Sequence, residues 1–261
     1  MNNIITKLES FGFIKVSGND AESFLQGQFT NDVRQVTAEQ DQLSAWCSSK
    51  GRIIVNFRLF KRDDAYYLLL PKDSMAFMLK RLQMYVLRAD VKLEDFSEKL
   101  SCLGVVGDYP ENNFAVLKVE TGRYLVVVED DIDSYEVDTG RWELLNILAG
   151  LPQIVAATAE AFVPQMVNFD AIGGVSFKKG CYTGQEIVAR MHYLGTVKRR
   201  MYLAKIDTTK IPQPGDELNG IGKIVNAQVH PDGGVVVLAV LQIKEAENDK
   251  NLQFMELPYK L

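Results

Sequence analysis

The sequence predicts an α+β protein, and three observations lead to that prediction. Short runs of β-branched and aromatic residues recur along the first half of the chain, separated by turns that contain Gly, Lys or Asp. Helical stripes of apolar residues lie between some of these runs. From about residue 197 the pattern changes to short strands and turns rich in Pro and Gly. Strands that return antiparallel, with helices between them, are typical of the α+β class.

The N-terminal third predicts a sheet with two helices. Asn19 or Asp20 is the expected N-cap of the first helix. Turns at Lys50-Gly51 and Asp63-Asp64 separate three consecutive strands, and apolar residues at helical spacing predict the second helix. The expected elements are a strand at 11–16, a helix ending near 28, strands at 43–47, 52–61 and 66–70, a helix at 73–84 and a strand at 91–93.

The rest of the chain predicts a second α/β part and a C-terminal β unit. Gly150 and Pro152 end a nearly all-apolar helix, as helix stop signals do. The expected elements are strands at 114–119 and 124–128, a helix at 139–150, and strands at 201–206 and 235–240. We therefore expect two regions, an α/β region of two interleaved subdomains at 1–196 and a small β-barrel at 197–261.

Composition restricts the class of protein. The 261 residues are 47% hydrophobic, enough for a sizeable core. The sequence shows no charged-then-apolar leader and no apolar run of about 18 residues, so we expect a cytoplasmic protein without a membrane segment. Its three cysteines are odd in number and widely spaced, and it has two histidines. This pattern predicts a reducing compartment and no metal site.

Positive charge is concentrated near one cysteine. Residues 176–200 contain six bases and one acid, although the net charge of the whole chain is −5. Such runs are usually solvated faces, but this one surrounds Cys181, so an anionic ligand there is a second hypothesis. The acidic remainder of the chain argues against direct binding of nucleic acid.

The segment 178–186 combines a thiol, two lysines, two glycines and an expected helix start. Thr183 and Glu186 fit a capping box. Cys181 then lies just before a positive helix end and beside Lys178 and Lys179, an arrangement that favours the thiolate. The alternative is a small buried cysteine in a tight turn.

The run Lys179-Gly180-Cys181-Tyr182-Thr183-Gly184-Gln185-Glu186 resembles the signature of the YgfZ-type folate-binding proteins, relatives of the glycine-cleavage aminomethyltransferase (T-protein). Three other segments agree with this resemblance, which covers about residues 10 to 200 well. They are Gln26-Gly27-Gln28-Phe29-Thr30-Asn31-Asp32-Val33, Ser49-Lys50-Gly51-Arg52 and Ala171-Ile172-Gly173-Gly174-Val175-Ser176-Phe177.

The resemblance implies a fold and a cofactor. The fold is two ferredoxin-like α/β units and a C-terminal β-barrel, packed around a central channel that receives tetrahydrofolate or another folate derivative. Trp142 and Phe11 fall where the family places aromatic rings against the folate, although core packing is the default role for a tryptophan. Leu148 stands where many relatives have a glutamate that grips the pterin, a loss that would cost about 1–3 kcal/mol of binding.

Further site residues follow from the same motifs. Cys181 is the expected functional thiol and Lys179 its activator, and Tyr182 and Gln185 belong to the same motif. Candidates for the channel mouth, or simply for capping and turning the chain, are Gln28, Asn31 and Asp32. Lys50 and Arg52 either form a hairpin tip or clamp a glutamate tail or phosphate.

The resemblance therefore predicts a folate-binding accessory protein that supports iron–sulfur enzymes, including those that modify tRNA. The alternative is a tetrahydrofolate-dependent one-carbon (aminomethyl) transferase. The segment 69–73 lacks the asparagine pattern that precedes the catalytic aspartate of the aminomethyltransferases, and Asp73 there is expected to cap a helix. This absence argues against the transferase.

Overall fold

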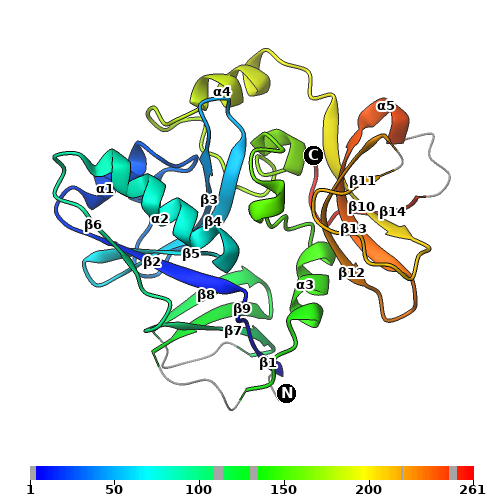
Figure 1. Ribbon diagram of the computed structural model, residues 1–261, viewed down its shortest axis with the longest axis horizontal. Coiled ribbons are helices and arrows are strands. Elements are labelled where there is room, and N and C mark those ends of the chain that lie inside the picture. The colour runs from blue at the N-terminus through cyan, green and yellow to red at the C-terminus, as the bar shows by residue number, and fades with distance from the viewer. Residues whose placement is uncertain (1–3, 109–113, 130–134, 219, 247–251) are drawn as a thin grey trace.

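The computed structural model describes residues 4–108, 114–129, 135–218, 220–246 and 252–261. Its strands form three antiparallel sheets, which we call the N-terminal, middle and C-terminal sheets (Figure 1). Helices and sheets are mixed along the chain, as predicted from the sequence. The ferredoxin-like organisation of the first two units and the domain boundary at 196/197 remain predictions.

The N-terminal sheet has the order β3-β4-β5-β2-β6 and is covered by helices on one face. Alternate residues of its strands enter different cores. Ile14 and Val16 pack under the helices, whereas Phe13 packs on the opposite face. Burial of both faces explains why β5 is buried along its whole length. The elements are β2 Phe11–Ser17, α1 Ala21–Gln26, β3 Gln42–Cys47, β4 Ile53–Arg62, β5 Ala65–Pro71, α2 Lys72–Val86 and β6 Lys92–Asp95.

The middle sheet, of order β1-β7-β9-β8, packs against the helix-free face of the N-terminal sheet. Because its edge strand β1 precedes β2 in the chain, the two units are interleaved. Helix α3 follows β9 and packs against β12 and β13 of the C-terminal sheet. The elements are β1 Ile4–Lys7, β7 Ser101–Val106, β8 Ala115–Glu120, β9 Arg123–Val128 and α3 Thr139–Leu148.

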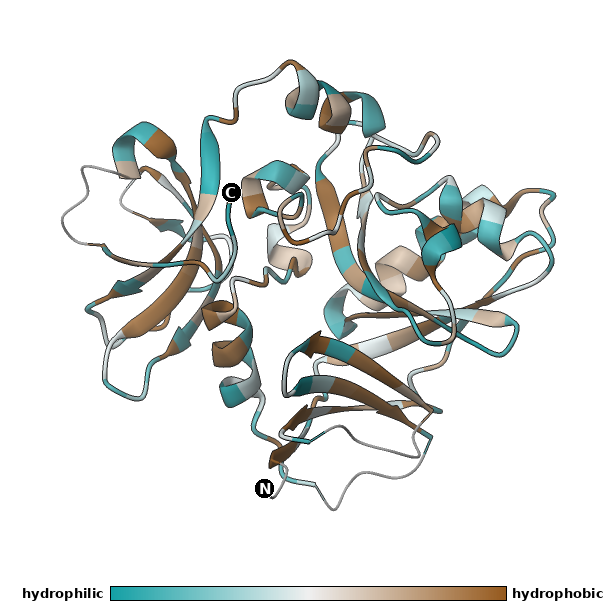
Figure 2. Cartoon of the chain, turned by 180° about the vertical axis from the view of Figure 1, so that it is seen from behind, coloured by the Kyte–Doolittle hydropathy of each residue, from teal (hydrophilic) through white to brown (hydrophobic). Residues whose placement is uncertain are grey.

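The C-terminal sheet has the order β11-β12-β13-β10-β14, which is open among the described residues. The closed barrel expected for this region does not form there, because the edge strands β11 and β14 are short and pair only with β12 and β10. In Figure 2 hydrophobic and hydrophilic segments alternate along α3 and the strands of this sheet, and β13 is apolar along almost its whole length. The elements are α4 Gln185–Tyr193, β10 Arg199–Ile206, β11 Glu217–Leu218, β12 Gly222–Val229, β13 Val235–Gln242, α5 Ile243–Ala246 and β14 Gln253–Met255.

Three short 3-10 helices also occur in the described chain: η1 Val33–Gln35, η2 Ala156–Thr158 and η3 Pro164–Val167. The segment that contains η2 and η3 packs with the C-terminal sheet into a core shared with the ends of β3 and β4. In the part of the chain that the structure describes, no helix is long and apolar enough to cross a membrane.

Candidate functional site

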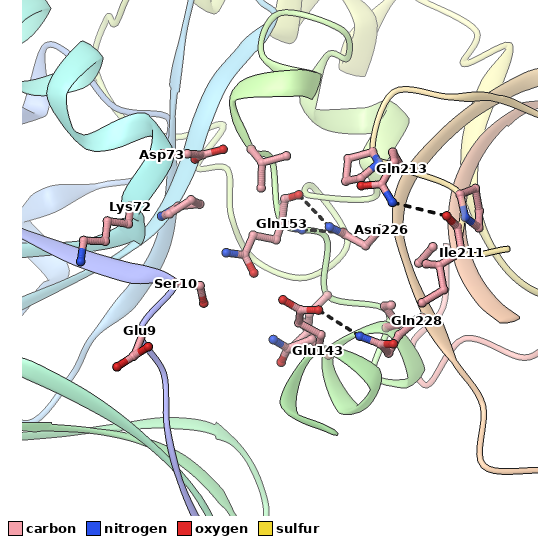
Figure 3. Close-up of a pocket in the computed structure, with 18 residues that line it drawn as sticks. Glu9, Ser10, Lys72, Asp73, Glu143, Gln153, Ile211, Gln213, Asn226 and Gln228 are labelled. Carbon is pink, nitrogen blue, oxygen red and sulfur yellow. Dashed lines mark hydrogen bonds between the residues drawn. The ribbon is translucent and has the colours of Figure 1, made fainter. Parts of the chain in front are cut away.

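A cleft of about 570 Å³, lined by both polar and apolar residues, lies where the N-terminal unit, α3 and the C-terminal sheet meet (Figure 3). The start of α2 forms one wall, α3 another, and β12 with the loop between β10 and β11 forms the third. This volume falls in the range of sites for small molecules. The polar lining residues are Glu9, Ser10, Lys72, Asp73, Glu143, Asn146, Gln153, Gln213, Asn226 and Gln228.

A smaller, mainly apolar cavity of about 70 Å³ adjoins the cleft. Phe11 and Trp142, predicted as a pair from the sequence, both line it. It shares four lining residues with the cleft: Pro71, Asn146, Leu151 and Gln153. The two spaces are therefore neighbours, and the smaller one is too narrow for a whole pterin ring.

Trp142 is also part of the core. Its side chain is 3% exposed and packs so closely on Gly104 that a Cβ there would lie 2.5 Å from the indole. The Arg123 guanidinium lies 5.0 Å from the ring centre, a cation–π distance. The indole N–H is buried without an acceptor among the described residues.

Asn146 is held in place by a buried arginine. Arg123 donates from Nη1 to Asn146 Oδ1 at 2.8 Å and forms a 2.6 Å ion pair with Glu120. Burial lowers the pKa of Arg123. The amide of Asn146, at the junction of cleft and cavity, is therefore oriented before any ligand arrives.

The cleft carries a carboxylate on α3 that the sequence did not single out. Glu143 accepts a hydrogen bond from Gln228 Nε2 at 3.1 Å, and burial raises its pKa. Leu148, where relatives have a glutamate, packs instead against the core of the C-terminal unit and lines neither space. Glu143 and Asn146 lie three residues apart on α3, among the apolar residues of its second half, and this spacing was the available signal for a polar face.

Asp73 also lines the cleft, although it does not cap α2. The helix begins at Lys72 after Pro71, so Asp73 lies in its first turn. Its Oδ2 accepts from the Ala156 N–H at 3.0 Å. On the far side, Asn226 exchanges two hydrogen bonds with the backbone of Gln153, at 2.9 and 3.0 Å. These contacts join the start of α2 and strand β12 to the segment that follows α3.

Cys181 lies away from the cleft in the loop before α4, and it is exposed, whereas Cys47 and Cys102 are buried. The expected capping box of Thr183 and Glu186 does not form. Gly184 is the N-cap, with φ 82°, and no side chain caps the helix. The reason is close packing, because Gly184 lies against the tip of the β3–β4 hairpin, where a Cβ would come 2.3 Å from the Ser48 carbonyl oxygen.

Lys179 has a structural position. Its side chain is buried, and Nζ donates to the carbonyl oxygens of Gln26 and Phe29 at 2.7 and 2.5 Å. Burial lowers the pKa of Lys179 to about 8. The ammonium group therefore joins the cysteine loop to the N-terminal motif, and its expected role as activator of the thiol is not supported by these contacts.

The N-terminal motif makes further contacts with the same region. Asn31 donates from Nδ2 to the carbonyls of Leu43 and Gly173, and Thr30 Oγ1 donates to Gly174 at 2.7 Å. Asp32 binds Arg34, which holds the pKa of the carboxyl at about 2. Thr30 and Asn31 therefore bind the segment around Gly173, whereas the contacts of Asp32 are local. None of these residues, nor Gln28, lines the cleft or the cavity.

The remaining predicted residues lie around the same loop and hairpin. Tyr182 is buried under the Lys179 ammonium, and Gln185 Oε1 accepts from the Tyr182 N–H at 3.3 Å. Lys50 is exposed at the hairpin tip. Arg52 donates from Nη1 to the carbonyls of Glu160 and Ala161. Among the described residues, no group of three His, Cys, Asp or Glu side chains could hold a metal ion.

Comparison with known proteins defines the class first. Residues 2–131 match the family model described as the GCVT N-terminal domain. The structure of glycine cleavage system aminomethyltransferase T from Bartonella henselae is similar, with a TM-score of 0.68 at 13% identity, over 93% of this chain and 79% of that one. The chain therefore has the fold of the aminomethyltransferase T-proteins.

The sequence then identifies the family within that class. The tRNA-modifying protein YgfZ of Photobacterium profundum is 32% identical over 98% of this chain and 92% of its own length. That of Escherichia coli O127:H6 is 32% identical over 97% and 92%. This chain belongs to the YgfZ family.

Proposed function

We propose that the chain is a folate-binding accessory protein of tRNA modification, and that the cleft is the mouth of the central channel expected from the family. One observation carries the proposal. Phe11 and Trp142 line one cavity, and the adjoining cleft carries the exposed carboxylate of Glu143, in a protein of the T-protein fold. The residues present suit a folate, because an aromatic wall, an orphaned indole N–H and a carboxylate are adjacent.

In this proposal the parts of the ligand divide between the two spaces. The cleft is large enough for a pterin and the small cavity is not, so the ring lies in the cleft with its edge toward Trp142. Glu143 supplies the carboxylate for the pterin amine that Leu148 cannot provide. Asn146, fixed by Arg123, supplies a further polar contact. Folate itself supplies the one-carbon chemistry when it is bound.

Tetrahydrofolate should quench the fluorescence of Trp142 in a saturable manner. The measurement is cleanest in a Trp46→Phe background, because Trp46 packs against Phe77 and Tyr85 and lines neither space. In that background Glu143→Gln should weaken binding by about 1–3 kcal/mol, roughly 5- to 150-fold, because a charge-assisted hydrogen bond is lost. Glu245→Gln, on exposed α5, is the matched control.

The absorbance of the ligand is corrected with N-acetyltryptophanamide titrated in parallel. A purely linear signal would reject folate binding. Saturable binding with equal affinities in Glu143→Gln and Glu245→Gln would keep the ligand but remove Glu143 from its site.

We further propose that Cys181 acts on the iron–sulfur enzymes that the accessory protein supports. It is exposed, and buried contacts hold its loop rigid against the N-terminal unit. Cys181→Ser should fail to restore modified tRNA nucleosides, measured by mass spectrometry, in a strain that lacks its own family member. Thr183→Ser in the same loop should restore them, and full restoration by Cys181→Ser would show that the thiol is dispensable.

The transferase alternative has one structural argument, the position of Asp73 in the cleft. A one-carbon transferase needs a carboxylate near the reacting carbon, and Asp73 could supply it. Turnover of an aminomethyl donor that disappears in Asp73→Asn would favour this alternative over the accessory role.

A further inference from the structure

A second recess, of about 250 Å³, lies apart from the cleft and is lined by three cations and no acid. Its walls come from the β3–β4 hairpin, the segment around η3 and the C-terminal sheet. The lining residues are Arg52, Ala161, Phe162, Met166, Arg199, Lys223 and Val240. We propose that this cationic recess binds a phosphate group.

Strand register brings two of the cations together. Val240 of β13 lies directly opposite Lys223 of β12 on one side and Met201 of β10 on the other. Opposed residues of a sheet share a face, as do residues two apart on one strand, so Arg199 joins the face of Met201. Lys223 and Arg199 therefore flank Val240 on the face that packs against the η3 segment.

Arg52 supplies the third cation from a distant part of the sequence. Its Nη1 donates to the carbonyls of Glu160 and Ala161 at 3.2 and 2.6 Å, and the Ile53 N–H donates to the Phe162 carbonyl at 2.8 Å. Among the described residues, no hydrogen bond uses its Nε or Nη2. The guanidinium is thus oriented at the rim with donors remaining for a ligand, and an oriented donor loses little entropy on binding.

Charge within the recess is only partly compensated. Lys223 pairs with Glu217 at 3.2 Å on the exposed surface. Arg200 binds Asp170, whereas its neighbour Arg199 has no acidic partner in the described chain. Because Phe162 and Val240 are buried beneath, charge interactions at the floor are stronger than in water.

Phosphate fits this arrangement better than a carboxylate does. A carboxylate is planar and is satisfied by a single guanidinium fork, whereas a phosphate presents oxygens in several directions. Here donors converge from three separate elements. A mononucleotide and an RNA backbone both present such a phosphate group, and the three cations would bind either through its oxygens.

The test uses two probes, adenosine monophosphate by calorimetry and a short single-stranded RNA without terminal phosphate by fluorescence anisotropy at several salt concentrations. The variants are Arg199→Gln and Lys223→Gln, and Lys198→Gln is the control of equal charge loss, because Lys198 does not line the recess. We expect each recess variant to weaken one probe about 10-fold or more and the control to leave it within about twofold.

If the recess variants lose affinity only for adenosine monophosphate, the site binds free phosphate esters. If they lose affinity for the RNA, and the slope of log affinity against log salt concentration falls by about one, the site binds the RNA backbone. Binding of neither probe, or equal losses in Lys198→Gln and Arg199→Gln, would overturn the proposal, since diffuse charge would then explain the effect. Melting temperatures confirm folding. None of these positions lines the folate cleft, so the two proposals fail independently.

Discussion

Gly184→Ala should lower the free energy of unfolding by about 3 kcal/mol or more, because strain and overlap add at this position. Its φ of 82° is left-handed, which costs an L-residue about 1–2 kcal/mol. A Cβ there would also lie 2.3 Å from the Ser48 carbonyl oxygen and 2.8 Å from Gly51 Cα. Both neighbours are backbone atoms at a hairpin tip, so neither can rotate away.

Gly173→Ala is the matched control for this prediction. Gly173 has a similar φ of 78°, yet a Cβ added there would meet nothing within 4 Å. The Gly173→Ala variant should therefore lose only the free energy of unfolding that a left-handed backbone costs an alanine, about 1–2 kcal/mol. Urea unfolding followed by circular dichroism measures both. Equal losses in the two variants would show that the hairpin does not restrain the loop of Cys181.

Trp142→Ala should destabilise the protein by about 3–5 kcal/mol, because a fully buried indole is removed from the contact between the middle sheet and α3. If Trp142 served only to stack on the ligand, the substitution would lower the affinity for folate more than the stability of the protein. We expect a larger loss of stability than that hypothesis predicts. The close contact with Gly104 and the cation–π contact with Arg123 make Trp142 a core residue as well as a cavity wall.

Trp142→Phe separates the two roles. It keeps an aromatic ring in the core, so stability should fall less than in Trp142→Ala. It also removes the indole N–H, so an acceptor on the ligand would lose its hydrogen-bond donor. Calorimetric affinity for tetrahydrofolate is measured at temperatures where every variant is folded, with Trp46→Phe as control. A stability loss below about 1 kcal/mol in Trp142→Ala would contradict the core role.

Local sequence signals were sufficient for most elements. Alternation and turn residues predicted β2 to β5, and the stop signals Gly150 and Pro152 predicted the end of α3 within two residues. These features depend on neighbours along the chain, so the sequence contains them directly. The same holds for the eight-residue motif around Cys181, from which the family resemblance was drawn.

Contacts between residues that are distant in the chain could not be predicted from such local signals. The sequence placed Lys179 beside the thiol, but folding directs its ammonium to Gln26 and Phe29, about 150 positions earlier in the chain. Thr183 and Glu186 have the spacing of a capping box, yet the approach of the hairpin to Gly184 determines how α4 begins. In each case tertiary packing overrode a local preference.

By itself the sequence determined the α+β class, the order of most elements, the motif that contains the exposed thiol and the family. Only the tertiary structure decided that Glu143, Asn146 and Asp73 share a cleft, that Phe11 and Trp142 line one cavity, and that three cations converge on one recess. The physical reason is that propensity and turn chemistry act over a few residues, whereas a binding site is made by side chains that packing brings together from remote strands and helices.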